Sequence, residues 1–172
     1  RSLAGDREVA GADFDLLQFM IARMQQACRS ERDGKQVDRG NPGKQASSPW
    51  TYAVRIDGKI VAANTASRAA TIDVDVDGDS KADARIQIGP AMRGTALRDT
   101  LDFINFNDFT NQIDFAQFGK AFNTHVDASL LSKLPREDLE GRTARVLGAY
   151  GVAPAGELPL VTPAEVEIGP KP

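Results

Sequence analysis

The sequence is poor in the residues that form disulfides, histidine-based metal sites and nucleophilic triads. Cys28 is the only cysteine among 172 residues, so no internal disulfide can form, and we expect it to be a small core residue of a helix. His125 is the only histidine, which excludes a metal site built from several histidines and makes it the one candidate base for a Ser-His-Asp triad. Because no G-x-S-x-G motif accompanies it, we interpret His125 as an ordinary helix residue and expect no cofactor.

Long apolar runs and a strong net charge are also missing. No run approaches the length that spans a bilayer. The net charge of −3 and the isoelectric point near 5.2 provide no basic surface, so we expect no nucleic acid and no anionic membrane as a direct partner. With 41% hydrophobic and 26% charged residues, the composition is that of a globular protein with its own core.

The first 49 residues differ in character from the rest. Apolar side chains at spacings of three and four predict an amphipathic helix from about Asp13 to Ser30; they are Phe14, Leu17, Ile21, Met24 and Cys28. The segment Glu31–Pro49 is rich in Gly, Pro, Ser and charge, which predicts a flexible connector. We therefore divide the chain into a helix and connector at 1–49 and a β-rich domain at 50–172.

Alternating apolar residues predict the first three strands. From Trp50 onward the pattern indicates either a hairpin that turns at Asp57-Gly58 or a bulge within one long, bent strand ending near Asn64. Thr71–Val76 and Ala84–Ile88 predict a second hairpin around a polar turn. In the register that we expect, Val76 pairs with Ala84, Val74 pairs with Ile86, and an outward Asp75 pairs with Arg85.

The remaining elements suggest a barrel. A short helix is expected at Thr95–Thr100, and a longer one from Asp108 or Thr110 to before Pro135. Strands follow at Ala144–Tyr150 and Leu160–Ile168, with Pro163 near an edge or bulge. This order predicts an α+β, mainly β fold: a five-stranded Greek-key barrel of the oligonucleotide/oligosaccharide-binding (OB) type, with a helix between strands three and four and an N-terminal helical arm.

Six of the eight phenylalanines lie between Phe103 and Phe122. This segment is predicted to contribute most of the aromatic side chains of the core. Five of its rings are expected to be mostly buried: Phe106, Phe109, Phe115, Phe118 and Phe122.

Polar residues around this segment form the candidate ligand site. The residues are Arg93, Thr95, Arg98, Asp99, Asn111 and Gln112. Guanidinium groups beside a helix start suit an anion or sugar hydroxyls, but Arg98 and Asp99 are equally well explained as an ion pair that ties the loop to the barrel. Helix capping is favoured for Asn107 and Asp108, whereas Asn111 and Gln112 are open to either role.

An aspartate-rich turn is the candidate metal site. Asp73, Asp75, Asp77 and Gly78 match the start of a calcium loop, but Ala84 stands where a bidentate Glu is needed. A structural hairpin is therefore favoured, and a weak calcium site at Asp77, Asp79 and Asp83 is the alternative.

Two motifs carry a family resemblance. Ile86–Asp99 (IQIGPAMRGTALRD) and Phe103–Ala116 (FINFNDFTNQIDFA) strongly resemble a bacterial family of unknown function described as predicted periplasmic lipoproteins. Asn64–Ala69 and Val161–Glu167 are also similar to it, and the likeness extends from about Ala12 to Gly169. The resemblance implies an exported accessory of sugar-uptake transporters, held at the membrane by a lipid upstream of Arg1. It carries over no catalytic or binding residue.

Together these observations favour a non-catalytic periplasmic protein, accessory to solute uptake, that binds a small polar ligand or an envelope or transporter partner. The alternative is a carbohydrate-active enzyme that uses carboxylates near Asp99 and Asp108. Paired acid–base chemistry of that kind depends on the separation of the two carboxyl groups.

Overall fold

The computed structural model describes residues 19, 22, 51–101, 104 and 106–172. Along the chain the elements are β1 (Thr51–Asn64), β2 (Thr71–Asp75), β3 (Ala84–Gln87), α2 (Ala96–Asp99), the 3-10 helix η1 (Phe106–Asp108), α3 (Gln112–Ser129), the 3-10 helix η2 (Leu131–Lys133), β4 (Thr143–Gly151) and β5 (Leu160–Ile168). Phe19 and Ala22 are helical. The rest of the expected helix at 13–30, including Cys28, and the connector at 31–49 lie outside the described residues.

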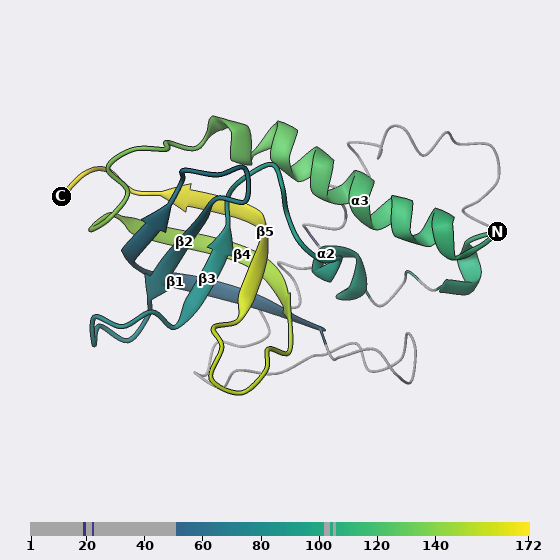
Figure 1. The fold of residues 1–172 in the computed structure, drawn as a ribbon, viewed down its shortest axis with the longest axis horizontal. Coiled ribbons are helices and arrows are strands. Elements are labelled where there is room, and N and C mark those ends of the chain that lie inside the picture. Colours follow the sequence, from purple (N-terminus) through teal and green to yellow (C-terminus); the bar gives the residue numbers. More distant parts are fainter. Residues whose placement is uncertain (1–18, 20–21, 23–50, 102–103, 105) are drawn as a thin grey trace.

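The five strands form a closed barrel in the order β1-β2-β3-β5-β4 (Figure 1). Neighbouring strands run antiparallel except β3 and β5, which pair in parallel. The connection from β3 to β4 contains α2 and α3. This arrangement confirms the predicted five-stranded barrel with a helix between strands three and four.

β1 is one long strand that pairs with two neighbours. Residues 51–59 pair with β4 and residues 59–64 pair with β2, so the strand must bend where it changes partner. Gly58 lies at this bend, where a Cβ would lie 2.2 Å from the carbonyl oxygen of Asp75. The structure thus confirms the long, bent strand, but its register shift lies between Ile60 and Ala62 and not at Asp57-Gly58.

The predicted register of the β2–β3 hairpin is wrong by two residues. The observed pairs are Asp73–Arg85, Val74–Ala84 and Ile72–Ile86. β2 ends at Asp75, whose carboxylate accepts the N–H groups of Gly78 at 2.7 Å and Ser80 at 2.9 Å. These bonds start the turn early, so Val76, which was expected to face inward, is 49% exposed.

β4 and β5 confirm the last two predicted strands. Their pairing shifts register between Leu147 and Gly148, opposite Pro163. A bulge at this place lets a proline, which lacks an N–H donor, lie within the ladder. The prediction that Pro163 lies near a bulge is therefore confirmed.

The core is largely aliphatic. Its most deeply buried aliphatic side chains come from the strands, from α2 and α3 and from the segments that connect them: Ile60, Ile72, Val74, Ile86, Ile88, Leu97, Ile104, Val126, Leu131 and Val161. Phe122 joins them at 2% exposure, whereas Phe106, Phe109, Phe115 and Phe118 are half-buried. These four rings contact one another with centroids 5.1–5.4 Å apart. The predicted burial of the aromatic rings therefore holds fully for Phe122 and only in part for the other four.

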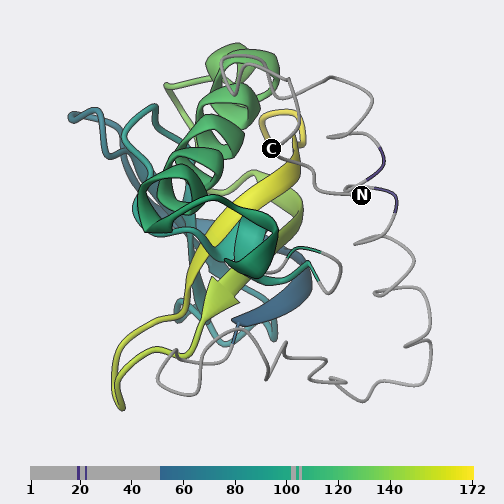
Figure 2. The same cartoon turned by 90° about the vertical axis from the view of Figure 1, so that its right-hand side faces the viewer.

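α3 lies beside the barrel, and its N-terminal half extends past the strands (Figures 1 and 2). The helix begins at Gln112, and the side chain of Asn111 caps it by accepting the N–H of Asp114 at 2.9 Å. Asn111 therefore has the capping role that was assigned to Asn107 and Asp108, which lie in η1. Among the residues described, no helix combines the length and hydrophobicity needed to cross a bilayer.

Candidate functional site

The loop before α2 is held by a buried glutamine. Gln87, only 4% exposed, accepts the N–H of Arg93 at 2.7 Å and donates to the carbonyl oxygen of Arg93 at 3.0 Å. Its amide also donates to the hydroxyl of Thr162 on β5 at 2.9 Å. The backbone at Arg93 is thus fixed, while its side chain is exposed and forms no ion pair within the described chain.

Three of the predicted site residues meet in one hydrogen-bonded group. Nε of Arg98 lies 2.7 Å from Oδ1 of Asp99, and Nη2 of Arg98 donates to the hydroxyl of Thr95 at 3.0 Å. That hydroxyl donates to Oδ2 of Asp99 at 2.7 Å. Nη1 of Arg98 donates to the carbonyl oxygen of Phe115 at 2.8 Å. Because Arg98 is only 8% exposed, these contacts fit the brace interpretation better than a ligand site.

The contact between α2 and α3 is close. A Cβ at Gly119 would lie 2.8 Å from Cγ2 of Thr95 and 3.3 Å from Nη1 of Arg98. Asn123, one turn further along α3, donates to the carbonyl oxygen of Gly94 at 2.9 Å. The sequence had indicated neither residue, yet both bring α3 against the loop that precedes α2.

The other two predicted site residues lie apart from this group. Asn111 caps α3, and Gln112 is the first residue of that helix. Both are exposed, and within the described chain no hydrogen bond joins either of them to Arg98. The six residues therefore do not form one hydrogen-bonded group in the part of the chain that the structure describes, and their ligand-binding role stays a prediction.

The aspartate-rich turn brings three carboxylates together. Oxygen atoms of Asp75, Asp77 and Asp83 lie within 4.8 Å of one another, close enough to share a cation. The predicted trio contained Asp79 in place of Asp75. Asp79 instead accepts the N–H of Lys81 at 2.8 Å, and Asp75 is buried at 5% exposure.

Hydrogen bonds within the turn support its structural role. The carboxylate of Asp75 accepts two backbone N–H groups, and Oδ2 of Asp83 accepts the N–H of Val76 at 2.7 Å. Burial raises the pKa of Asp75, but hydrogen bonds from the backbone N–H groups of Gly78, Ser80 and Asp79 are among the interactions that together lower that pKa below its ordinary value. The carboxylate is therefore ionised at neutral pH.

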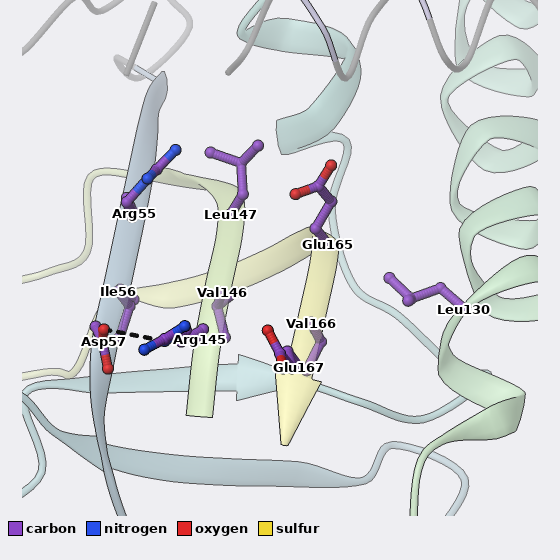
Figure 3. Close-up of a pocket in the computed structure, with 10 residues that line it drawn as sticks. All are labelled: Arg55, Ile56, Asp57, Leu130, Arg145, Val146, Leu147, Glu165, Val166 and Glu167. Atoms are coloured by element: carbon purple, nitrogen blue, oxygen red, sulfur yellow. Dashed lines mark ion pairs between the residues drawn. The ribbon is translucent and has the colours of Figure 1, made fainter. Parts of the chain in front are cut away.

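A pocket of about 460 Å³ lies against β1, β4 and β5, near the C-terminal end of α3 (Figure 3). Its lining residues are Arg55, Ile56, Asp57, Leu130, Arg145, Val146, Leu147, Glu165, Val166 and Glu167. Its volume lies within the range of about 300–1,000 Å³ that is usual for small-molecule sites. We call it the β1–β4–β5 pocket.

Strand pairing places six lining residues, five of them charged, in two rows across the three strands. One row is Arg55, Leu147 and Glu165, and the other is Asp57, Arg145 and Glu167. The row between them consists of Ile56, Val146 and Val166, all buried. Figure 3 shows the side chains of the first row projecting in one direction, because residues directly opposite one another on adjacent strands share a face of the sheet.

The charges of the pocket are only partly paired. Nε of Arg145 lies 3.3 Å from Oδ2 of Asp57, and the two side chains are 71% and 63% exposed, so water weakens this ion pair. Glu167 is the cross-strand neighbour of Arg145 on the other side. Arg55 forms no ion pair with any residue that the structure describes.

The sequence had not indicated this pocket. Each strand contributes two outward residues spaced by two, a pattern that is ordinary for a half-buried strand. Only the order β1-β4-β5 brings together side chains that lie about ninety and twenty residues apart in the chain.

Comparison with known proteins agrees with this fold. Residues 25–167 match the model of a family described as predicted periplasmic lipoprotein. The chain belongs to this family. Family membership supports a periplasmic location and attachment to a membrane, and confirms the resemblance found in the sequence. A search of curated proteins gave no significant match.

A solved structure is similar over almost the whole chain. It is the crystal structure of an OB-fold protein from Thermotoga maritima MSB8, with 15% sequence identity and a TM-score of 0.58. The similarity covers 91% of this chain and 99% of that protein. At this identity the comparison concerns the fold, and it agrees with the OB-type barrel observed in this member of the lipoprotein family.

Proposed function

We propose that this lipoprotein-family member is a non-catalytic accessory of solute uptake in the periplasm, and that it binds a small polar ligand in the β1–β4–β5 pocket. A lipid on a segment preceding Arg1 would hold it at the membrane, as the description of its family as lipoprotein supports. The pocket is the single observation that carries the proposal. It combines a suitable volume with a lining of charged and apolar residues.

The catalytic alternative has less support. Both carboxylate oxygens of Asp99 are engaged, one by Arg98 and the other by Thr95. A carboxylate held in this way has a structural task and does not face the pocket. Sugar binding also has little support, because the described residues that line the pocket include no aromatic ring to stack on a sugar face.

An envelope or transporter partner is the second candidate. Its support is the end of α3 that extends past the barrel, where Ile113 is 67% exposed. The half-buried rings of Phe106, Phe109, Phe115 and Phe118 lie in the same part of the chain. Exposed apolar side chains beside partly covered rings suit a protein contact.

The proposal is tested by thermal shift with neutral sugars, sugar acids, amino acids, short peptides and divalent cations. A ligand that binds the folded state raises the melting temperature by mass action. We expect at least one polar compound to do so, with a smaller effect in Glu167→Gln than in Glu157→Gln, a matched change in the exposed β4–β5 loop. Mass spectrometry should recover the compound unchanged. A flat response to all classes would contradict the proposal and favour the protein partner.

A further inference from the structure

The arrangement of charge in the β1–β4–β5 pocket restricts its ligand. Arg55 stands on β1, at one side of the pocket, without an ion-pair partner among the described residues. Glu165 and Glu167 stand on β5, at the other side, and Glu167 is exposed. Between them, on β4, lie the apolar Leu147 and an Arg145 already paired with Asp57. Apart from the Asp57–Arg145 ion pair, the pocket therefore has a guanidinium group on β1 and carboxylates on β5, with β4 between them.

Ligands with charge of one sign fit this arrangement poorly. The lining holds three carboxylates and two guanidinium groups, so a dianion or a dication would meet like charge at one side as well as opposite charge at the other. A molecule with a negative group at one end and a positive group at the other meets opposite charge at both sides. The guanidinium fork of Arg55 suits a carboxylate in particular.

The distance between the two sides sets the length of the ligand. β1 and β5 flank β4, and adjacent strands lie about 4.8 Å apart, so directly opposite backbone positions on the two sides are about 10 Å apart. Glu167 lies two residues, or about 7 Å, beyond the position opposite Arg55, so the diagonal between these two positions is about 12 Å, a distance that the long side chains of Arg55 and Glu167 shorten. An extended peptide advances about 3.4 Å per residue, so three residues span about 10 Å. Resting on the proposed function, we infer that the ligand is a small zwitterion of short-peptide type, with its carboxylate at Arg55 and its ammonium group at Glu167.

Calorimetric titration of the full chain at low salt tests this inference with glycine and triglycine as probes. Triglycine is expected to bind more tightly than glycine, and more weakly at high salt because exposed charges are screened. Arg55→Met and Glu167→Gln should each weaken triglycine binding by about five-fold, the order for one exposed ion pair. Arg68→Met, an exposed change in the β1–β2 connection, and Glu157→Gln are the matched controls and should bind as the unmodified protein does.

Modified probes identify which end lies where. N-acetyl-triglycine lacks the ammonium group, so it should bind the unmodified protein less tightly than triglycine does. To Glu167→Gln the two compounds should bind equally well. Triglycinamide lacks the carboxylate, so it should bind the unmodified protein less tightly than triglycine does. To Arg55→Met the two compounds should bind equally well. Such paired losses measure the coupling of one ligand group to one side chain.

Two results would overturn the inference, and they separate it from the proposed function. If glucose, succinate or putrescine binds more tightly than triglycine and its affinity falls in Arg55→Met or Glu167→Gln, the inferred zwitterionic ligand is wrong, whereas the proposed binding in the β1–β4–β5 pocket is supported. If none of these probes binds and no compound raises the melting temperature, the inference and the small-ligand function fail together.

Discussion

The guanidinium carbon of Arg98 lies 3.6 Å from the centroid of the Phe115 ring, and Nη1 of the same arginine donates to the Phe115 carbonyl oxygen. One side chain thus ties α2 to α3 through a ring contact and a hydrogen bond. Asp99 and Thr95 hold the guanidinium from its other sides. This group fixes the position of α3 beside the barrel.

Replacing Arg98 should therefore cost stability. Arg98→Met leaves Oδ1 of Asp99 and the Phe115 carbonyl oxygen without the donors that Arg98 supplies, and we expect the free energy of unfolding to fall by about 2–4 kcal/mol. Arg93→Met, which changes an exposed side chain, should stay within about 0.5 kcal/mol. Urea denaturation of both variants measures this difference. Equal stability of the Arg98→Met and Arg93→Met variants would contradict the role of Arg98 in holding α2 against α3.

Two substitutions in α3 should differ as clearly in their effect on stability. Phe122→Ala removes a ring that is 2% exposed, and we expect a loss of about 3–5 kcal/mol in the free energy of unfolding. Ile113→Ala changes a side chain that is 67% exposed and should shift stability by less than about 0.5 kcal/mol. The same denaturation assay checks both. A large loss for Ile113→Ala would show that its side chain is buried in solution.

The bend of β1 depends on the missing side chain of Gly58. Gly58→Ala places a Cβ about 2.2 Å from the carbonyl oxygen of Asp75, so one of the two strands must move. We expect a loss of about 1–3 kcal/mol, the usual cost of overpacking. Lys59→Ala, at the exposed neighbouring position, is the control. If Gly58→Ala and Lys59→Ala have the same melting temperature, the close approach of β1 and β2 at Gly58 is wrong.

Asp75 should make the hairpin sensitive to acid. Its hydrogen bonds hold the folded-state pKa below the ordinary value of 3.8. The ionised group therefore stabilises the fold above that value, and this contribution is lost as the pH falls through 3.8 toward the folded-state pKa. Asp75→Asn should lower the melting temperature at pH 7, and the difference from the unmodified protein should shrink toward pH 2. An equal difference at both pH values would contradict this account.

Asp79→Asn is the matched control within the same turn. Asp75 accepts one N–H on each oxygen, so an amide can satisfy only one of them, whereas Asp79 accepts one backbone N–H that an Asn oxygen can still accept. The structural interpretation predicts that Asp79→Asn and added calcium leave the melting temperature unchanged. A calcium-dependent rise that Asp83→Asn abolishes would establish the metal site instead.

Local patterns predicted the elements, and contacts distant in sequence decided the details. Alternation predicted all five strands, and the order of elements predicted the barrel. The register of β2 could not be predicted, because the hydrogen bonds of Asp75 to its own turn outweigh the pairing of Val76. The β1–β4–β5 pocket could not be predicted either, because Arg55 and Glu167 come to line the same pocket only after the barrel closes.

The central claim is that the protein binds its ligand over β1, β4 and β5, and amide NMR during titration with triglycine tests it most directly. The account predicts that shifts concentrate at residues 55–57, 145–147 and 165–167, and that Arg55→Met needs about five times more triglycine to reach the same shifts. The Arg93–Asp99 segment should stay unchanged. Saturable shifts centred on Arg93–Asp99, with residues 55–57, 145–147 and 165–167 unaffected, would contradict the claim and restore the loop before α2 as the binding site.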